Sequence, residues 1–262
     1  MADAKYDPGV PCQGPIVNEP DRRFRIEAVI VCDQYHDFLG LTLPTNKFLF
    51  DRIIVVTSPE DKRTQRVCEH YHVECLPTDA LRSRWKEFRK ADGINEGLAK
   101  LKKDNWVAHI DADIYLPPQT RLLLENANLD KSMIYGIDRF IVHGRSEWDE
   151  FIDTPKLQQE AGAYIHMNTF PMGTRVMHGF AGGYVPIGFF QMFNPSVSLI
   201  DKYPTDCNHA GRTDTLFAQK WPRHKRGLIP EIVGYHLESV DAGNAVNWSG
   251  RKSKPFTRES DE

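Results

Sequence analysis

The chain has 262 residues, of which 40% are hydrophobic and 26% charged, and its net charge is −3. This composition is typical of a globular protein and excludes wholesale disorder. The balanced charge gives no global basic field for nucleic acid. No apolar stretch approaches the ~18–20 residues of a membrane span, and the N-terminus lacks a signal-peptide pattern. We therefore expect a cytoplasmic protein (in the host cytoplasm if the chain is viral) with reduced thiols.

The first part of the chain alternates strand and helix patterns. Residues 1–23 are rich in Pro, Gly and Asp and predict an extended arm. The apolar, β-branched runs Ile26–Val31 and Ile53–Val56 predict buried strands, and helical spacing follows each of them. A short strand over 73–77 completes a β-α-β-α-β order. That order implies parallel strands joined by crossover helices.

The next segment carries a pair of carboxylates. A helix predicted over 84–106 leads into a buried strand, 106–116, in which Asp111 and Asp113 follow the apolar run. Ligands of open parallel sheets bind beyond the carboxyl ends of the strands. Two buried like charges repel unless a cation lies between them. Oxygen ligands suit Mg²⁺ or Mn²⁺, and waters and substrate phosphates would complete the shell, so the pair predicts a metal site for a nucleotide.

The second half of the chain is less regular. Strands are predicted over 132–143 and 184–193, and helices over 145–162 and 213–221. These patterns indicate one mixed α/β domain. Its predicted parts are a nucleotide-binding half (24–130), an acceptor-side half (131–246) and a mobile basic tail (247–262).

Two stretches of this sequence resemble the glycosyltransferases of the GT-A fold. "VIVCDQYHDFLGLTLPTNKFLFDRIIVVTSPEDKRT" is similar to their opening βαβ unit, and "GINEGLAKLKKDNWVAHIDADIYLPP" to their approach to an Asp-x-Asp motif, here Asp111-Ala112-Asp113. The resemblance implies a mostly parallel central sheet flanked by helices. It also implies a metal-dependent enzyme that transfers a sugar from a UDP- or GDP-sugar to a hydroxyl acceptor, such as a glycan or a hydroxymethylated DNA base.

The resemblance also implies a metal-binding role for three residues. Mn²⁺ or Mg²⁺ would bridge Asp113, and Asp111 through water or the donor ribose, to the diphosphate, stabilising the charge on the leaving group. Members of the family often supply a third ligand, and His236 in "EIVGYHLES" is the candidate. A packed histidine is the alternative interpretation of that position.

The resemblance further implies donor contacts at the end of the second strand. Thr57, Ser58 and Asp61 would contact ribose or base, although a β-to-α turn with a helix cap explains the same residues. Asn95, on the helix before the motif, matches a base contact of the family by position. Arg251 and Lys252 would reach the diphosphate and close over it, unless they belong to a solvated tail.

Acceptor and sugar contacts are predicted in the second half. Gly182 and Gly183 lie in a glycine-rich run whose backbone can approach a ligand closely, and Gln191 could bind a sugar hydroxyl. The alternative is a turn and a bulged strand. Trp248 could stack on a sugar or base. Asp214 begins a helical stretch, either as the general base of an inverting enzyme or as an N-cap.

Two further functions stay open at this level. A sugar nucleotidyltransferase normally carries a Gly-rich, basic loop straight after its first strand, and "CDQYHDF" has no glycine there. A non-catalytic nucleotide-sugar-binding module would not need both Asp111 and Asp113. The basic clusters at 222–226 and 251–254 are compatible with a nucleic-acid acceptor, although the net charge does not require one.

Overall fold

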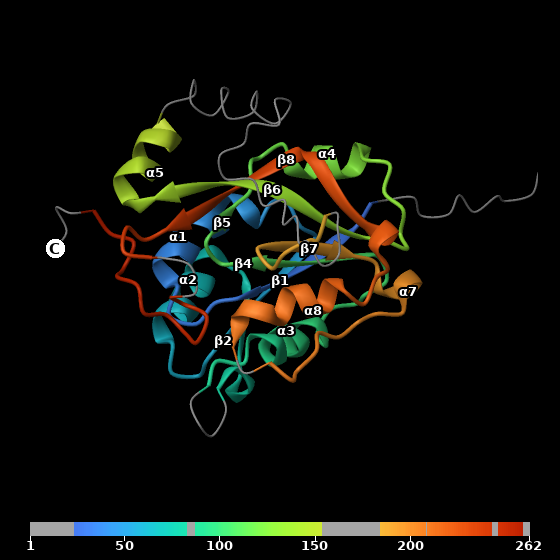
Figure 1. Ribbon diagram of the computed structural model, residues 1–262. Coiled ribbons are helices and arrows are strands. Elements are labelled where there is room, and N and C mark those ends of the chain that lie inside the picture. The colour runs from blue at the N-terminus through green and yellow to red at the C-terminus, as the bar shows by residue number, and fades with distance from the viewer. Residues whose placement is uncertain (1–23, 83–86, 154–183, 208, 243–245, 259–262) are drawn as a thin grey trace, which may run out of the picture.

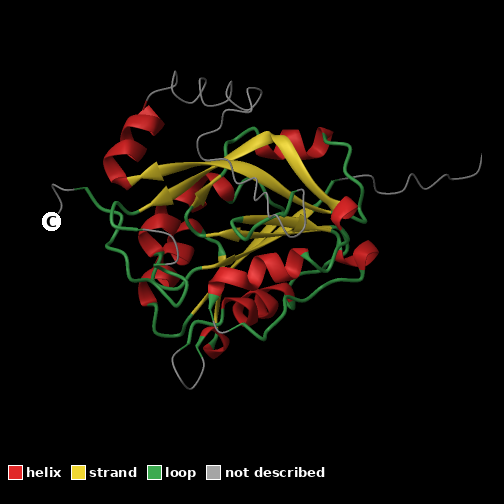
Figure 2. Cartoon of the chain, in the orientation of Figure 1, coloured by secondary structure: helices red, strands yellow, loops and turns green. Residues whose placement is uncertain are grey.

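The computed structural model describes residues 24–82, 87–153, 184–207, 209–242 and 246–258. Across these ranges eight strands form one mixed sheet, in the order β3-β2-β1-β4-β7-β6-β8-β5 (Figure 1). Helices cover both faces of the sheet (Figure 2). The α/β class predicted from the sequence, with a mostly parallel central sheet, is therefore confirmed. The predicted N-terminal arm lies outside the described residues.

The first half of the chain builds the parallel part of the sheet. Its strands are β1 (Ile26–Val31), β2 (Arg52–Thr57), β3 (Glu74–Pro77) and β4 (Trp106–Asp111). Its helices are α1 (His36–Asn46), α2 (Lys62–Tyr71) and α3 (Lys90–Leu98), with a short 3₁₀ segment η1 (Asp79–Leu81). β1 is buried along its whole length between β2 and β4. An apolar strand without alternation is expected where helices cover both faces.

The second half adds an antiparallel part and returns to the edge of the sheet. Its strands are β5 (Ile114–Tyr115), β6 (Ile134–His143), β7 (Phe190–Phe193) and β8 (Arg226–Glu238). Its helices are α4 (Thr120–Asn126), α5 (Gly144–Asp153), α7 (Pro195–Ser198) and α8 (Thr213–Ala218), with 3₁₀ segments η2 (Ala210–Arg212) and η3 (Arg223–Lys225). β7 pairs antiparallel with β4, whereas β8 runs parallel to β6.

Two apolar layers hold the helices against the sheet. On one face Leu39 and Leu43 of α1 share a buried cluster with Leu124 of α4. On the other face α3 and α8 share a second cluster, and they lie side by side below the sheet in Figure 1. A Cβ on Gly97 would come within 2.6 Å of the Val29 side chain, so only glycine allows α3 to approach β1 this closely.

Several element boundaries differ from those predicted. Of the helix predicted over 84–106, residues 84–86 lie outside the described residues, and the described part forms the shorter α3 because the chain turns after Leu98. The strand predicted over 106–116 divides into β4 and β5 around a turn at residues 112–113. The strand predicted over 184–193 shortens to β7, since Pro186 has no N–H to donate to a ladder. Of the helix predicted over 145–162, α5 is described to Asp153 and the remainder lies outside the described residues.

Two bulk expectations can be compared with the described residues. None of the described helices has the length and apolar character needed to cross a membrane. The four cysteines in the described ranges carry free thiols.

Candidate active site

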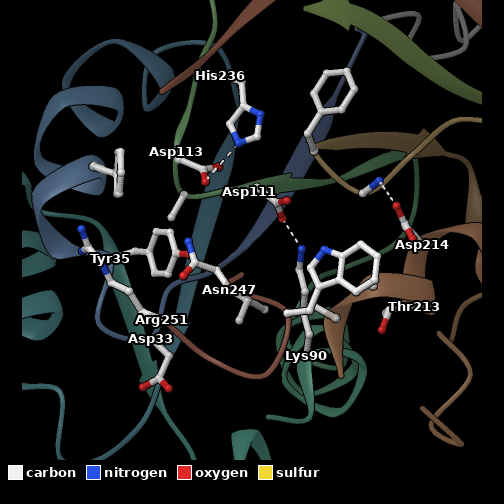
Figure 3. A pocket seen from close by; sticks show the side chains of 18 of the residues that line it. Asp33, Tyr35, Lys90, Asp111, Asp113, Thr213, Asp214, His236, Asn247 and Arg251 are labelled. Atoms are coloured by element: carbon white, nitrogen blue, oxygen red, sulfur yellow. Dashed lines mark hydrogen bonds and ion pairs between the residues drawn. The ribbon is translucent and has the colours of Figure 1, made fainter. Parts of the chain in front are cut away.

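A pocket of about 350 Å³ lies at the carboxyl ends of β1 and β4. Charged and polar side chains from both halves of the chain line it: Asp33, Lys90, His109, Asp111, Asp113, Arg139, Asp214, His236, Asn247 and Arg251. Figure 3 labels all of these except His109 and Arg139. Both aspartates of the Asp-x-Asp sequence therefore face one cavity. It is the place where parallel strands leave a crevice for a ligand.

Asp111 is paired with a lysine. It is the last residue of β4, and its Oδ1 accepts from the ammonium of Lys90, the first residue of α3. The Nε2 atom of His109, two residues earlier on β4, lies 3.5 Å from the same oxygen. The cation that the sequence pattern required beside Asp111 is thus supplied by the protein itself.

Asp113 has a different partner and one unpaired oxygen. β5 begins one residue later and pairs with β8 so that Ile114 lies opposite His236. This register brings His236 Nε2 within 3.3 Å of Asp113 Oδ2 (Figure 3). The other oxygen, Oδ1, is buried and has no hydrogen-bond partner among the described residues, and neither has Nδ1 of His236.

The two carboxyl groups are shifted in opposite directions. Burial raises the pKa of Asp111, and the charge of Lys90 offsets this only in part. Burial acts in the same sense on Asp113, but the charge and hydrogen bond of His236 outweigh it, so its pKa is lowered. A neighbour of opposite charge favours the ionised carboxylate. Asp113 is therefore the more strongly ionised member of the pair.

The site fits a divalent cation held by two protein ligands. No three His, Cys, Asp or Glu side chains in the described ranges are grouped to hold a metal, and Asp111 is occupied by Lys90. Asp113 and His236 do fit, because Asp113 has a buried Oδ1 without a hydrogen-bond partner among the described residues and the imidazole of His236 lies beside the same carboxylate, with Nε2 3.3 Å from Oδ2. Carboxylate oxygen and imidazole nitrogen also suit Mn²⁺.

Asp214 approaches the pocket from the opposite wall. It is the second residue of α8, after an N-cap at Arg212, so it does not cap the helix itself. Its Oδ2 accepts from the backbone N–H of Gly188 at 2.6 Å and its Oδ1 from that of Thr215 at 2.7 Å. A Cβ on Gly188 would come within 2.9 Å of the Asp214 Cβ. The carboxylate is therefore held in one orientation while it lines the cavity.

The residues predicted at the end of β2 are engaged within the fold. Asp61 is the N-cap of α2: its side chain accepts from Thr64 N and from Gln34 N at 2.6 Å. Ser58 donates to Asp33 Oδ1 at 2.6 Å, and Thr57 is fully buried. None of Thr57, Ser58 and Asp61 lines the pocket, whereas Asp33, which follows β1, does. Any effect of Ser58 on a ligand would pass through Asp33.

Two amides predicted as ligand contacts also have internal partners. Asn95 bonds the backbone N–H and C=O of Tyr203 at 2.8 and 3.0 Å, joining α3 to the segment before α8. Gln191 is fully buried, donates to the backbone oxygens of Pro186 and Asp214, and accepts from the Tyr203 hydroxyl. Gly182 and Gly183 lie outside the described residues.

The C-terminal segment is held against α1. Arg251 pairs with Asp37 at 2.5 and 2.7 Å and donates to the backbone oxygen of Gln34. Its guanidinium also lies 4.9 Å from the ring centre of Tyr35. Arg251 lines the pocket, but its charge is paired, whereas Lys252 is exposed and lies outside the lining. The described part of this segment, through residue 258, therefore contacts α1 through Arg251 and Phe256.

Trp248 extends this segment towards the second half of the chain. Its ring stacks on His209 at 5.8 Å, with an interplanar angle of 6°. The carbonyl of Trp248 accepts from Ala210 N at 2.8 Å, and 40% of the residue is exposed. It lines the pocket together with Asn247, whose side chain bonds the backbone of Lys252 and Ser253.

Sequence reasoning missed two cations of the pocket, Lys90 and Arg139. Lys90 is one of several basic residues in 84–103, and nothing in the sequence marks it as the one that faces Asp111. Arg139 offered a clearer signal, because it and the adjacent Asp138 are charged residues within the largely apolar strand pattern of β6. A charge inside such a run requires a partner or a function.

Comparison with known proteins gives similarity of fold and no family assignment. No protein-family model matches the sequence, and no curated protein matches it. Solved structures do match. A glucosyl-3-phosphoglycerate synthase from Mycobacterium tuberculosis, in complex with Mn²⁺, uridine diphosphate and glucosyl-3-phosphoglycerate, is 12% identical with a TM-score of 0.44, over 92% of this chain and 75% of that one.

Two other structures show a similar level of likeness. A mannosyl-3-phosphoglycerate synthase from Rubrobacter xylanophilus is 17% identical with a TM-score of 0.40, and the match spans 65% of this chain and 53%, about half, of that one. A 4-diphosphocytidyl-2C-methyl-D-erythritol synthase from Anaerococcus prevotii is 15% identical with a TM-score of 0.43, over 81% and 89% of the two chains. Sugar-transferring and nucleotidyl-transferring enzymes are both represented among the similar folds.

Proposed function

We propose that this protein is a metal-dependent glycosyltransferase that moves a sugar from a nucleoside-diphosphate sugar, such as a UDP- or GDP-sugar, to an acceptor hydroxyl. The observation that carries the proposal is the unpaired, buried Oδ1 of Asp113 beside His236. A buried ionised oxygen without a donor costs free energy, and a cation would remove that cost. Asp113 lies just beyond the carboxyl end of the parallel strand β4, where a nucleoside-diphosphate sugar would bind.

Asp113 and His236 would hold the metal, and Lys90 would complement it. When bound, Mn²⁺ or Mg²⁺ would neutralise the charge that develops on the leaving nucleoside diphosphate. Lys90 brings a second positive charge to the same place; burial lowers its pKa, but the charge of Asp111 outweighs this and the pKa is raised. Lys90 therefore stays protonated while Asp111 orients it.

Asp214 is the proposed general base. An oxygen of its carboxylate takes the proton of the acceptor hydroxyl as the acceptor oxygen bonds to the anomeric carbon. The bond from that carbon to the diphosphate oxygen breaks and its electron pair leaves with the diphosphate, so one bond forms and one breaks. The N–H groups of Gly188 and Thr215 fix the carboxylate, which serves a base that must reach one hydroxyl. A displacement of this kind inverts the anomeric configuration.

The wall around Trp248 is the proposed place for the sugar or base. Its exposed ring face offers a flat apolar surface, while Arg251 anchors the backbone that carries it. Whether Arg251 leaves Asp37 to reach a diphosphate, as the tail-closure prediction requires, is testable through donor affinity. A glycan and a hydroxymethylated DNA base both remain in the proposed acceptor class.

The test is a donor panel with product identification. The purified full chain is incubated with UDP- and GDP-sugars, with and without Mn²⁺, and the release of nucleoside diphosphate and of pyrophosphate is measured separately. Mn²⁺-dependent release of UDP or GDP supports the proposal. Pyrophosphate formation from a sugar phosphate and a nucleoside triphosphate would instead indicate a nucleotidyltransferase. Binding of a nucleotide sugar without turnover under any acceptor would indicate a binding module.

A further inference from the structure

One pocket cation stands apart from the others. Three Lys or Arg side chains line the cavity in the described ranges: Lys90, Arg139 and Arg251. Lys90 is paired with Asp111 and Arg251 with Asp37. Arg139 forms no ion pair or hydrogen bond with any described residue, and its Nε is buried without a partner.

Arg139 is held by an aromatic ring instead of a carboxylate. Its guanidinium carbon lies 4.7 Å from the ring centre of Phe189. Phe189 is 2% exposed, and its backbone oxygen accepts from the N–H of Asp111 at 3.2 Å, so the ring is fixed beside the carboxylate pair. The face of an aromatic ring attracts a cation. It offers no acceptor, however, to the N–H groups at the edge of the guanidinium. The five N–H donors of the fork are left without acceptors in the described part of the protein.

This arrangement is costly unless a ligand completes it. Burial lowers the pKa of Arg139, and the charges of Asp113, Asp111, Glu238 and Asp214 offset this only in part. None of these four carboxylates comes within ion-pair distance of the guanidinium. Because arginine keeps its proton in proteins, the side chain remains a partly buried cation with a buried Nε. A pocket cation with a buried N–H and no partner is a candidate anion-binding residue.

We propose that Arg139 receives an oxyanionic group of the acceptor, a carboxylate or a phosphate, so that the transferred sugar goes to a hydroxy acid or a hydroxyl-bearing phosphate compound. This inference rests on the proposed function. The planar fork of a guanidinium matches two oxygens of either group. Phe189 orients the fork, and the carboxylates of the pocket repel an anion that is placed away from it, which gives specificity.

The sheet order assigns this anion to the acceptor. Asp33 follows β1 and Asp111 ends β4, whereas Arg139 lies on β6, two strands farther along the order β1-β4-β7-β6. In Figure 3, Asp33 and Arg251 lie on one side of Asp111. Asp214, the proposed base, lies on the other side of Asp111. Arg139 packs on Phe189, next to the Gly188 that holds Asp214. The anion site therefore adjoins the base that would activate the acceptor.

The test measures binding of glycerol 3-phosphate, inorganic phosphate and neutral glycerol to the full chain by calorimetry and thermal shift. Arg139→Met removes the charge and keeps a long apolar side chain. Arg139→Lys keeps the charge without the fork, and Arg66→Met is a matched control on the exposed face of α2. Losing a charge-assisted contact should weaken phosphate binding about 10- to 100-fold in Arg139→Met. The phosphate affinity of Arg139→Lys should lie between those of Arg139→Met and the wild type, and the phosphate affinity of Arg66→Met should equal that of the wild type.

A second readout separates a binding role from a structural one. Without added anion, Arg139→Met should unfold at the same temperature as the wild type or higher, because an unpaired, partly buried charge has been removed. Phosphate should raise the unfolding temperature of the wild type and leave that of Arg139→Met unchanged. A variant that is destabilised without anion and still responds to phosphate would overturn the assignment.

Donor ligands identify the source of the anion. We expect glycerol 3-phosphate to bind the UDP-saturated protein and the free protein with the same affinity. The proposal is overturned if Arg139→Met weakens the binding of UDP as much as that of phosphate, or the binding of UDP-glucuronate more than that of UDP-glucose. In either case the oxyanion would belong to the donor. UDP release without Arg139-dependent phosphate binding would refute the anion site alone. Arg139-dependent phosphate binding without any donor cleavage would refute the proposed transferase alone.

Discussion

The two sides of the pocket differ in how fully their charges are paired. One side, here the paired wall, consists of the lining residues Asp33 and Arg251 together with their ion-pair partners Arg82 and Asp37, which stand outside the lining. Asp33 accepts from Ser58 and Arg82, and Asp37 from Arg251 and the backbone N–H of Phe256. The other side, the open wall, consists of Asp113, Arg139 and His236. Each member of the open wall has a buried polar atom without a partner among the described residues.

This difference in pairing separates residues that stabilise the fold from residues that would bind a ligand. Buried polar groups in proteins are nearly always hydrogen-bonded, so a cluster of exceptions at one end of a sheet indicates a ligand that the protein alone does not supply. The paired wall stabilises the fold around the cavity. Substitutions there should cost stability first, whereas those in the open wall should cost activity first.

The largest effect is expected at Asp113. Asp113→Asn removes the charge that would hold the metal while preserving size, and donor turnover should fall about 10²- to 10³-fold, as when a group that stabilises transition-state charge is lost. Its unfolding temperature should change little. Asp130→Asn, at an exposed aspartate paired with Lys225, is the matched control and should retain full turnover. Near-normal turnover in Asp113→Asn would contradict the proposed role of the open wall in holding the metal.

Arg251 should show the opposite pattern. The side chains of Arg251 and Asp37 are 8% and 12% exposed, and breaking a buried pair by removing one partner costs about 3 kcal/mol or more. Arg251→Met should therefore lower the free energy of unfolding by about 3 kcal/mol. Lys252→Met, one residue away and exposed, should stay within about 0.5 kcal/mol of the wild type.

The double variant sharpens this test. With Asp37→Asn added to Arg251→Met, the total loss should be smaller than the sum of the two single losses, because neither residue then leaves a buried charge unpaired. If Arg251→Met keeps wild-type stability but loses donor affinity, Arg251 belongs to the donor site, as the sequence predicted, and the paired wall is not purely structural.

The same pair predicts a pH dependence. Burial alone would raise the pKa of Asp37, but the hydrogen bonds from Arg251 and the Phe256 N–H outweigh it, so the pKa lies below 3.8. Stability from this carboxylate is therefore fully present above pH 3.8 and is lost as the pH falls through the folded-state pKa. The stability difference between wild type and Asp37→Asn should be constant from about pH 5 to 7 and shrink below about pH 3.8. A constant difference down to about pH 2, measured by urea unfolding, would contradict the pairing.

The sequence predicted the fold better than it predicted the partners within the site. The largely apolar runs of β1, β2 and β4 lack an alternating pattern because helices cover both faces, so the order of these runs along the chain was enough to indicate a parallel sheet. The position of Asp111 and Asp113 at a strand end followed from the same pattern. Boundaries failed where local chemistry interrupts a run, as at Pro186 before β7.

The partners of polar residues could not be inferred, because they depend on contacts between distant elements. Lys90 meets Asp111 only because α3 packs under β1, and His236 meets Asp113 only through the register of β5 and β8. Asp61 and Asn95 have the side chains of ligand contacts, yet a helix cap and a loop junction use them. Residue type alone does not distinguish these uses.

The smallest effect is expected at Trp248, which joins the C-terminal segment to the chain just before α8. Its backbone is fixed by the segment that Arg251 anchors, and its ring contacts His209 and Gly211 near α8. Because 40% of the residue is exposed, Trp248→Ala should cost stability by about 1 kcal/mol or less, and an aromatic stacking contact should weaken substrate affinity about 3- to 10-fold. Trp248→Phe should recover most of that affinity, since a ring face remains.

The two possible results for Trp248 lead to different assignments of the C-terminal segment. If KM rises in Trp248→Ala with the unfolding temperature unchanged, the exposed ring acts on the ligand, and the paired wall serves to hold a binding surface in place. If the unfolding temperature falls as far as in Arg251→Met, the His209 stack is part of the fold. The open wall would then be the part of the pocket that selects the substrate, and the sugar would have to be recognised by Asp113, His236 and the acceptor-side residues alone.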